Sequence, residues 1–231
     1  NSIDEAREGF GNVIYVTRYL DYSIEVEDFG RGIPVEYNEK EKKYNWELVF
    51  CELYAGGKYQ NNAGGNYEFS LGLNGLGACA TQYSSAYMDV EILRDGYKFN
   101  LHFEKGENIG GLEKTKFRHR HTGSRIRWKP DMSVFTDIRI PLEFYQSTLK
   151  RQAVVNSGLR FVLKNETEPG VFEEFEYYYE NGIVDYVKEL CGGKELTNVH
   201  FIETERKGRD REDLEEYKVK MSFAFCFNNE I

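Results

Sequence analysis

Three glycine-containing segments in the first third of the chain constrain the fold more than any other feature. They read DFGRGIP at 28–34, AGGK at 55–58 and GLNGLG at 72–77, and each flanks a predicted strand or helix. Glycine tolerates positive φ, so these segments let the chain turn sharply. At a helix start they also let backbone N–H groups surround phosphate oxygens. None matches the dinucleotide fingerprint or the Walker pattern, so any one alone is better explained as an ordinary turn.

Strand patterns dominate the rest of the chain and favour an α+β fold. Apolar and polar residues alternate in 12–28, which predicts two strands joined by a turn at Leu20–Asp21. The stretch 87–106 predicts a hairpin that turns at Asp95–Gly96. The remaining predicted elements are helices within 46–54, 71–87, 140–158 and 181–193, strands at 123–131, 159–165, 172–180, 199–208 and 217–229, and an exposed loop at 35–45.

Composition narrows the class of protein. A net charge of −9 argues against a surface that attracts nucleic acid backbones, so DNA would have to be held by another segment. No apolar run approaches the roughly 18 residues of a membrane span, and the first residues lack a signal-peptide pattern. Four widely spaced cysteines without a CxxC pair indicate reduced thiols in a cytoplasmic protein.

Both ends of the chain look like parts of longer elements. The segment NSIDEA at 1–6 resembles the middle of a helix, so we expect the natural N-terminus to lie further upstream. From Asn181 onward a short helix leads into a long hairpin whose edges would be unpaired. We therefore expect residues 1–180 to form one domain and residues 181–231 to be the truncated beginning of a second.

Five segments, taken in order, resemble the nucleotide-binding motifs of the GHKL ATPases. They are the three glycine segments, NSIDEA before them and TGSRIR at 122–127 after them. The match is to the B subunits of bacterial type II topoisomerases, DNA gyrase and topoisomerase IV, and it covers nearly the whole chain. It implies a two-layer α+β sandwich, the Bergerat-type ATP-binding fold, in which helices cover a mixed and mainly antiparallel sheet. The start of an α/β transducer domain would follow.

The resemblance implies an ATP site. Asp28 would accept a hydrogen bond from the adenine amino group and share a water with Ser124, although a strand-end aspartate is also a common turn cap. Backbone N–H groups from Leu73 to Gly77 would bind the phosphates. The implied ATP-binding residues are Asn1, Glu5, Asp28, Arg31, Gly32, Ile33, Pro34, Lys58, Tyr67, Leu73, Asn74, Gly75, Leu76, Gly77, Ser124 and Ile126.

The charged and polar residues of this set have separate implied roles. Arg31 and Glu5 would pair across the pocket mouth, and Lys58 would reach a phosphate as a point charge. Asn1 would ligate Mg²⁺ through its side-chain oxygen, a hard ligand that suits this ion. Arg94 fits a rim position that binds coumarin-type inhibitors, although an ordinary hairpin-turn arginine is the simpler explanation for the native reaction.

Three positions depart from the family pattern. Phe29 replaces a usual aspartate, Leu71 a usual glycine and Asn74 a usual histidine. Phe29 would change the packing beside the pocket, and Leu71 would change the flexibility of the lid over it. Asn74 would change the side-chain contacts to phosphate. The family's general-base glutamate would precede Asn1, so we expect no catalytic residue within this sequence and poor ATP hydrolysis by this segment alone.

The resemblance implies a domain that binds and hydrolyses ATP with Mg²⁺. ATP-dependent homodimerisation would close a gate and drive DNA strand passage, giving supercoiling or decatenation. Other domains would hold DNA, and the topoisomerase A subunit would complete an A2B2 assembly. The alternatives are another GHKL protein (a chaperone, a mismatch-repair ATPase or a histidine kinase) or a nucleotide-gated clamp without significant turnover.

Overall fold

The computed structural model describes residues 1–55, 75–118, 121–209, 211 and 216–229. The chain divides into two compact units. The first unit comprises Asn1–Leu149 and Arg160–Tyr177, and the second comprises Lys150–Leu159 and Tyr178–Ile231. Within the described ranges, no helix combines the length and apolar character needed to cross a membrane.

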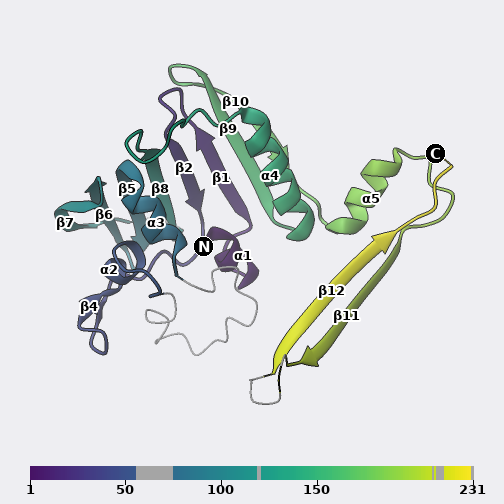
Figure 1. The fold of residues 1–231 in the computed structure, drawn as a ribbon, viewed down its shortest axis with the longest axis horizontal. Coiled ribbons are helices and arrows are strands. Elements are labelled where there is room, and N and C mark those ends of the chain that lie inside the picture. Colours follow the sequence, from purple (N-terminus) through teal and green to yellow (C-terminus); the bar gives the residue numbers. More distant parts are fainter. Residues whose placement is uncertain (56–74, 119–120, 210, 212–215, 230–231) are drawn as a thin grey trace. The chain divides into compact units, whose positions relative to one another are not determined.

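An eight-stranded sheet forms the centre of the first unit (Figure 1). The strand order is β10-β9-β1-β2-β8-β5-β6-β7, and all neighbouring strands are antiparallel except β1 and β9. The strands are β1 (Val13–Arg18), β2 (Ile24–Asp28), β5 (Ser85–Arg94), β6 (Tyr97–Glu104), β7 (Glu107–Lys116), β8 (Gly123–Pro130), β9 (Arg160–Glu168) and β10 (Val171–Tyr177). The expected mixed, mainly antiparallel sheet is confirmed.

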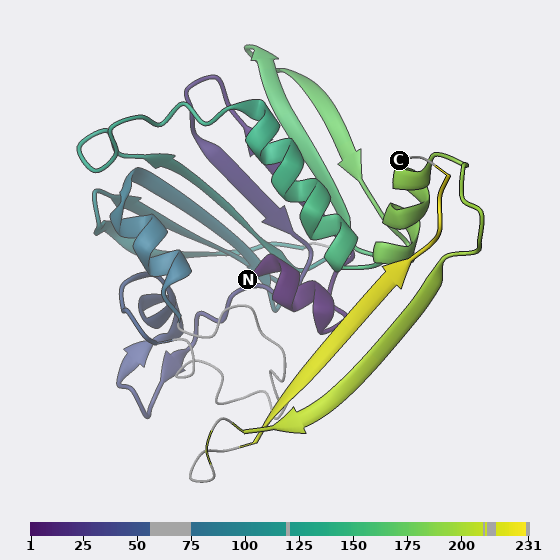
Figure 2. The same cartoon turned by 45° about the vertical axis from the view of Figure 1, so that its right-hand side comes forward.

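Helices cover one face of this sheet. They are α1 (Ser2–Arg7), α2 (Asn45–Phe50), α3 (Gly77–Tyr83) and the part of α4 (Leu142–Val155) up to Leu149, which belongs to the first unit. Helix α3 lies over the same face as the first turns of α4 (Figures 1 and 2). Trp46 and Phe50 of α2 pack in one buried cluster with Met88 and Ile92 of β5. Alternate residues of a strand point to the same face, so the apolar positions of the strands collect under the helices.

The opposite face of the sheet carries the intervening, charged positions. Asp89 and Glu91 of β5 lie opposite Arg127 and Arg125 of β8 in the strand register. Arg125 forms an ion pair with Glu91 at 3.2 Å, and Lys98 pairs with the same carboxylate at 2.5 Å. The described part of the first unit is therefore a two-layer structure with one apolar, helix-covered face and one charged face.

Two local expectations were wrong, and a third was right in kind but too long. The loop predicted at 35–45 contains a small hairpin of β3 (Tyr37–Asn38) and β4 (Lys43–Tyr44). Strand β7 was not predicted because Gly110 and Gly111 interrupt its alternation, and both adopt positive φ. The helix expected within 71–87 is present as α3, but it ends at Tyr83 because Ser85 already pairs with β8. In each case pairing with a neighbouring strand overrides the local pattern.

The second unit combines the end of α4 with helix α5 (Ile183–Cys191) and a hairpin of β11 (His200–Gly208) and β12 (Tyr217–Phe225). The two strands pair antiparallel along their full lengths. Lys150 forms an ion pair with Glu189 of α5 at 2.6 Å, and Glu189 also accepts a hydrogen bond from Tyr179. The helix and the two strands predicted from the sequence after Asn181 are all present.

Candidate functional site

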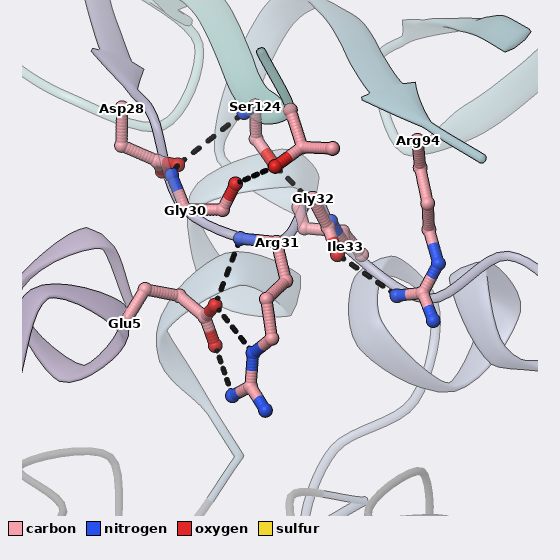
Figure 3. A network of polar contacts seen from close by, with 9 residues as sticks. Glu5, Asp28, Gly30, Arg31, Gly32, Ile33, Arg94 and Ser124 are labelled. Carbon is pink, nitrogen blue, oxygen red and sulfur yellow. Dashed lines mark hydrogen bonds and ion pairs between the residues drawn. The ribbon is translucent and has the colours of Figure 1, made fainter. Parts of the chain in front are cut away.

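The candidate site is centred on Asp28, the last residue of β2. Its side chain shares a sheet face with the apolar residues Ile24 and Val26, the face that the helices cover. Antiparallel pairing with β8 places Ser124 directly opposite. The Ser124 N–H donates to Asp28 Oδ1 at 3.3 Å, and the Gly30 N–H donates to the same oxygen at 3.0 Å (Figure 3). These bonds set the direction of the carboxylate.

Among the residues that the structure describes, the other carboxylate oxygen of Asp28 has a single partner. The Ser2 hydroxyl, from the first residue of α1, donates to Asp28 Oδ2 at 2.7 Å. A carboxylate offers about four acceptor positions, so these three bonds leave one position on Oδ2. Asp28 is only half-buried, and the remaining position can therefore accept a bond from a ligand. The arrangement selects for a ligand that presents a hydrogen-bond donor.

Two glycines, Gly32 and Gly123, let backbone segments approach one another closely in this region. Gly32 has φ +81°, and a Cβ there would lie 2.9 Å from the Leu93 carbonyl oxygen. Gly123 has φ +154°, and a Cβ there would lie 2.1 Å from the Asp28 carbonyl oxygen. Both contacts are to backbone, which cannot move aside without disturbing the sheet. Gly32 and Gly123 are thus required by close approach of backbone segments.

The Thr122 and Ser124 hydroxyls fasten the loop after β2 to the start of β8. Thr122 Oγ1 donates to the Gly30 carbonyl at 2.6 Å, and the Ile33 N–H donates to Ser124 Oγ at 3.2 Å. Ser124 is buried, with 7% of its surface exposed. Its hydroxyl therefore orders the loop as well as lying beside Asp28.

The expected ion pair between Arg31 and Glu5 is confirmed. Arg31 Nε and Nη2 donate to the two oxygens of Glu5 at 2.9 and 2.8 Å, a bidentate arrangement, and the Arg31 N–H donates at 3.1 Å (Figure 3). The Arg31 guanidinium also lies over the Phe10 ring, 4.3 Å from its centroid. Planar pairing and stacking together fix the guanidinium more firmly than a single ion pair would.

Arg94 anchors the other end of the same loop. Its Nη1 donates to the Gly32 carbonyl at 3.0 Å (Figure 3). Its Nε lies 3.2 Å from a Glu36 carboxylate oxygen and 3.1 Å from an Asp95 carboxylate oxygen. Arg94 ends β5, so it links the β5–β6 hairpin to the loop that follows Asp28. This contact gives Arg94 a role in holding the loop that the sequence did not indicate.

The expected apolar wall is partly assembled. Ile33 and Ile126 both pack against the buried cluster between α2 and the sheet, and so does Ala78 of α3. Pro34, which follows Ile33 in sequence, is half-buried. Gly75, Leu76 and Gly77 lie at the start of α3, with Gly75 at φ 59°. The start of α3, Ile33 and Ile126 therefore lie against the same buried cluster.

Asn1 has a side chain that suits the proposed magnesium role. It occupies the N-cap position of α1, it is exposed, and its side chain forms no capping hydrogen bond. Its amide oxygen is a hard ligand of the type that Mg²⁺ accepts. The next residue, Ser2, contacts Asp28, so α1 places Asn1 near the same site.

Four expected ATP-binding residues, Lys58, Tyr67, Leu73 and Asn74, lie outside the described residues. Sequence reasoning missed Ser2 and Phe10. Ser2 follows Asn1 within the NSIDEA segment, but no pattern in the sequence signals its bond to Asp28. Phe29, which departs from the family pattern, packs edge-on against His121 at a centroid distance of 5.2 Å and Tyr15 at 6.1 Å.

Two solved structures have the same fold. One is the 43K ATPase domain of Thermus thermophilus gyrase B in complex with an aminocoumarin, with a TM-score of 0.71 and 26% identity over 92% of this chain and 52% of that one. The other is the topoisomerase IV ATP-binding domain of Francisella tularensis in complex with a small-molecule inhibitor. Its TM-score is 0.65, and it is 30% identical over 79% of this chain and 83% of that one. The fold and the site define a domain of the GHKL ATPase class.

Sequence comparison identifies the family within that class. The DNA gyrase B protein of Thermotoga maritima is 32% identical over 97% of this chain and 34% of its own length. No protein-family model matches the chain. The chain belongs to the family of type II topoisomerase B subunits, which includes gyrase B and topoisomerase IV B. This membership argues against the alternatives of a chaperone, a mismatch-repair ATPase or a histidine kinase. It spans about a third of the length of the curated relatives it matches.

Proposed function

We propose that the first unit binds ATP with its adenine amino group on Asp28. One observation carries this proposal: the Asp28 carboxylate is held by three donors and keeps one acceptor position on Oδ2. Adenine presents an amino donor at the corresponding edge, whereas guanine presents a carbonyl oxygen. A fixed carboxylate therefore favours adenine and repels guanine.

The other residues of the site would position the rest of the nucleotide. Ile33, Pro34 and Ile126 would pack against the adenine ring, and the Arg31–Glu5 pair would close the pocket mouth. The N–H groups at the start of α3 would contact phosphate, together with Lys58. Asn1 would help to hold Mg²⁺, which when bound neutralises charge on the triphosphate.

We also propose that the whole protein couples ATP hydrolysis to DNA strand passage. The support is membership of the type II topoisomerase B subunits. In this proposal ATP drives homodimerisation, an A subunit completes the assembly, and other domains bind DNA in the cytoplasm. Residues 1–180 would be the ATP-binding domain and 181–231 the beginning of the transducer domain.

Calorimetric titration of the chain with ATP and with GTP, each with Mg²⁺, tests the nucleotide assignment. We expect ATP to bind and GTP to bind at least about 100-fold more weakly, because a site built to accept a hydrogen bond rejects a ligand that presents an acceptor there. Equal affinity for ATP and GTP would show that Asp28 does not bind the adenine amino group. Phosphate release by the whole protein would then separate an ATPase from a nucleotide-gated clamp, which binds without turnover.

A further inference from the structure

Two cysteines of the second unit are far apart in sequence but in contact in space. Cys191 is the last residue of α5, and Cys226 follows the end of β12. Their sulfur atoms lie 2.8 Å apart although the residues are 35 positions apart. All four cysteines of the chain are free thiols in the structure. The sequence, with no CxxC pair, gives no sign of this contact.

The backbone around both cysteines holds this contact in place. Gly192 ends α5 in the left-handed conformation with φ 58°, and its N–H donates to the Lys188 carbonyl at 3.1 Å. On the other side the Leu196 N–H donates to the Phe227 carbonyl at 2.8 Å, and the Phe227 N–H donates to Thr197 Oγ1 at 3.2 Å. Cys226 is thus fixed by its neighbour Phe227 against the segment that leaves α5.

Burial also distinguishes the two thiols. Cys191 is 8% exposed, whereas Lys188, Glu189 and Leu190 before it are exposed. Cys226 is only partly buried, so a reagent can reach it from solvent. A hydrogen bond to Cys226 raises the pKa of the Cys191 thiol to about 11, which makes Cys191 a poor first nucleophile at neutral pH.

We propose that Cys191 and Cys226 form a reversible intramolecular disulfide when the protein meets a low-molecular-weight disulfide oxidant. The Cys226 sulfur attacks the oxidant, forms a mixed disulfide and releases one small thiol. The Cys191 sulfur then attacks the Cys226 sulfur, forms the internal disulfide and releases the second small thiol. Two protein thiols are oxidised, the oxidant is reduced to two thiols, and both protein thiol protons go to the leaving sulfurs.

The bond would tie the end of α5 to the end of β12 and close a loop that contains the whole β11–β12 hairpin. Closing a loop of this size restricts the unfolded chain and lowers the unfolding equilibrium constant by on the order of 100-fold. The site thereby links the stability of the second unit to the thiol–disulfide balance of its surroundings.

The direct test is mass spectrometry after incubation of the full chain with glutathione disulfide. Free thiols are alkylated in denaturant, and the chain is then digested without reduction. We expect the loss of two hydrogen atoms, a cross-linked peptide that joins Cys191 to Cys226, and alkylated Cys51 and Cys79. Four alkylated cysteines, or a disulfide at Cys51 or Cys79, would overturn the assignment.

Matched variants isolate the pair. Cys51→Ser retains both partners and should oxidise like the natural chain. Cys226→Ser should give at most a mixed disulfide on Cys191 without loss of two hydrogens, and Cys191→Ala provides the same test if Cys226→Ser fails to fold. An internal disulfide that persists in either variant would contradict the pairing.

Hydrogen exchange checks the structural consequence. Amides of β11 and β12 should exchange at least about tenfold more slowly in the oxidised chain than in the reduced chain, while amides of β5 and β6 in the first unit should not change. Identical exchange in β11 and β12 in the two states would show that the bond does not constrain the second unit.

Discussion

Replacing Asp28 with asparagine is the sharpest test of the nucleotide site. The amide oxygen can still accept the N–H bonds from Gly30 and Ser124, which lie at 3.0 and 3.3 Å from Oδ1. The Ser2 hydroxyl can rotate to accept a bond from the new amide nitrogen. The loop should therefore keep its conformation, and the variant should fold.

ATP binding should not survive the same change. The amide nitrogen would face the adenine amino group, so one charge-assisted hydrogen bond is lost and two donors oppose each other. The lost bond costs about 1.5–3 kcal/mol and the unsatisfied donors about 1–3 kcal/mol. Together they raise the Kd for ATP by roughly two to four orders of magnitude.

Isothermal titration calorimetry measures the affinity, and circular dichroism melting confirms the fold. Glu27→Gln is the matched control, because it removes the same charge one residue earlier, where the side chain points to the opposite face of the sheet. The reasoning is refuted if folded Asp28→Asn binds ATP within about threefold of the natural chain. An equal loss in Glu27→Gln would mean that net charge, and not the Asp28 contact, controls binding.

Three further predictions concern neighbouring features. Ser2→Ala removes one donor to Asp28 and should weaken ATP binding about two- to tenfold by calorimetry; an unchanged Kd would show that the other two donors suffice. Gly123→Ala places a Cβ 2.1 Å from the Asp28 carbonyl oxygen and should cost more than about 3 kcal/mol in chemical denaturation, so a change below about 1 kcal/mol would refute the clash. The hydrogen bond between His102 and Asp89 raises the pKa of His102. The protonated imidazole therefore stabilises the folded state fully below pH about 6.5, the ordinary value, and this contribution is lost as pH rises through the raised pKa. The stability advantage over His102→Gln should therefore shrink from pH about 6 to 8 in urea unfolding, and a constant or growing advantage would count against it.

The local pattern of the sequence was enough to identify most elements. Period-two alternation in β2 and in the β5–β6 hairpin, with the turn at Asp95–Gly96, predicts those strands because their neighbours are close in sequence. Where pairing opposed the pattern, as in the glycine-containing β7, the prediction failed. The motif resemblance supplied the candidate ATP site, and the structure confirms the pairing of Arg31 with Glu5.

The sequence alone determined which residues have the chemistry for a nucleotide site, and the tertiary structure decided how they meet. The register of β2 with β8 sets Ser124 opposite Asp28 across 96 positions of chain. The Ser2 bond to Asp28 and the contact of Cys191 with Cys226 likewise depend on segments that meet only after folding. Periodicity reports which face of an element is buried, but the partner of that face is selected by packing of the whole unit.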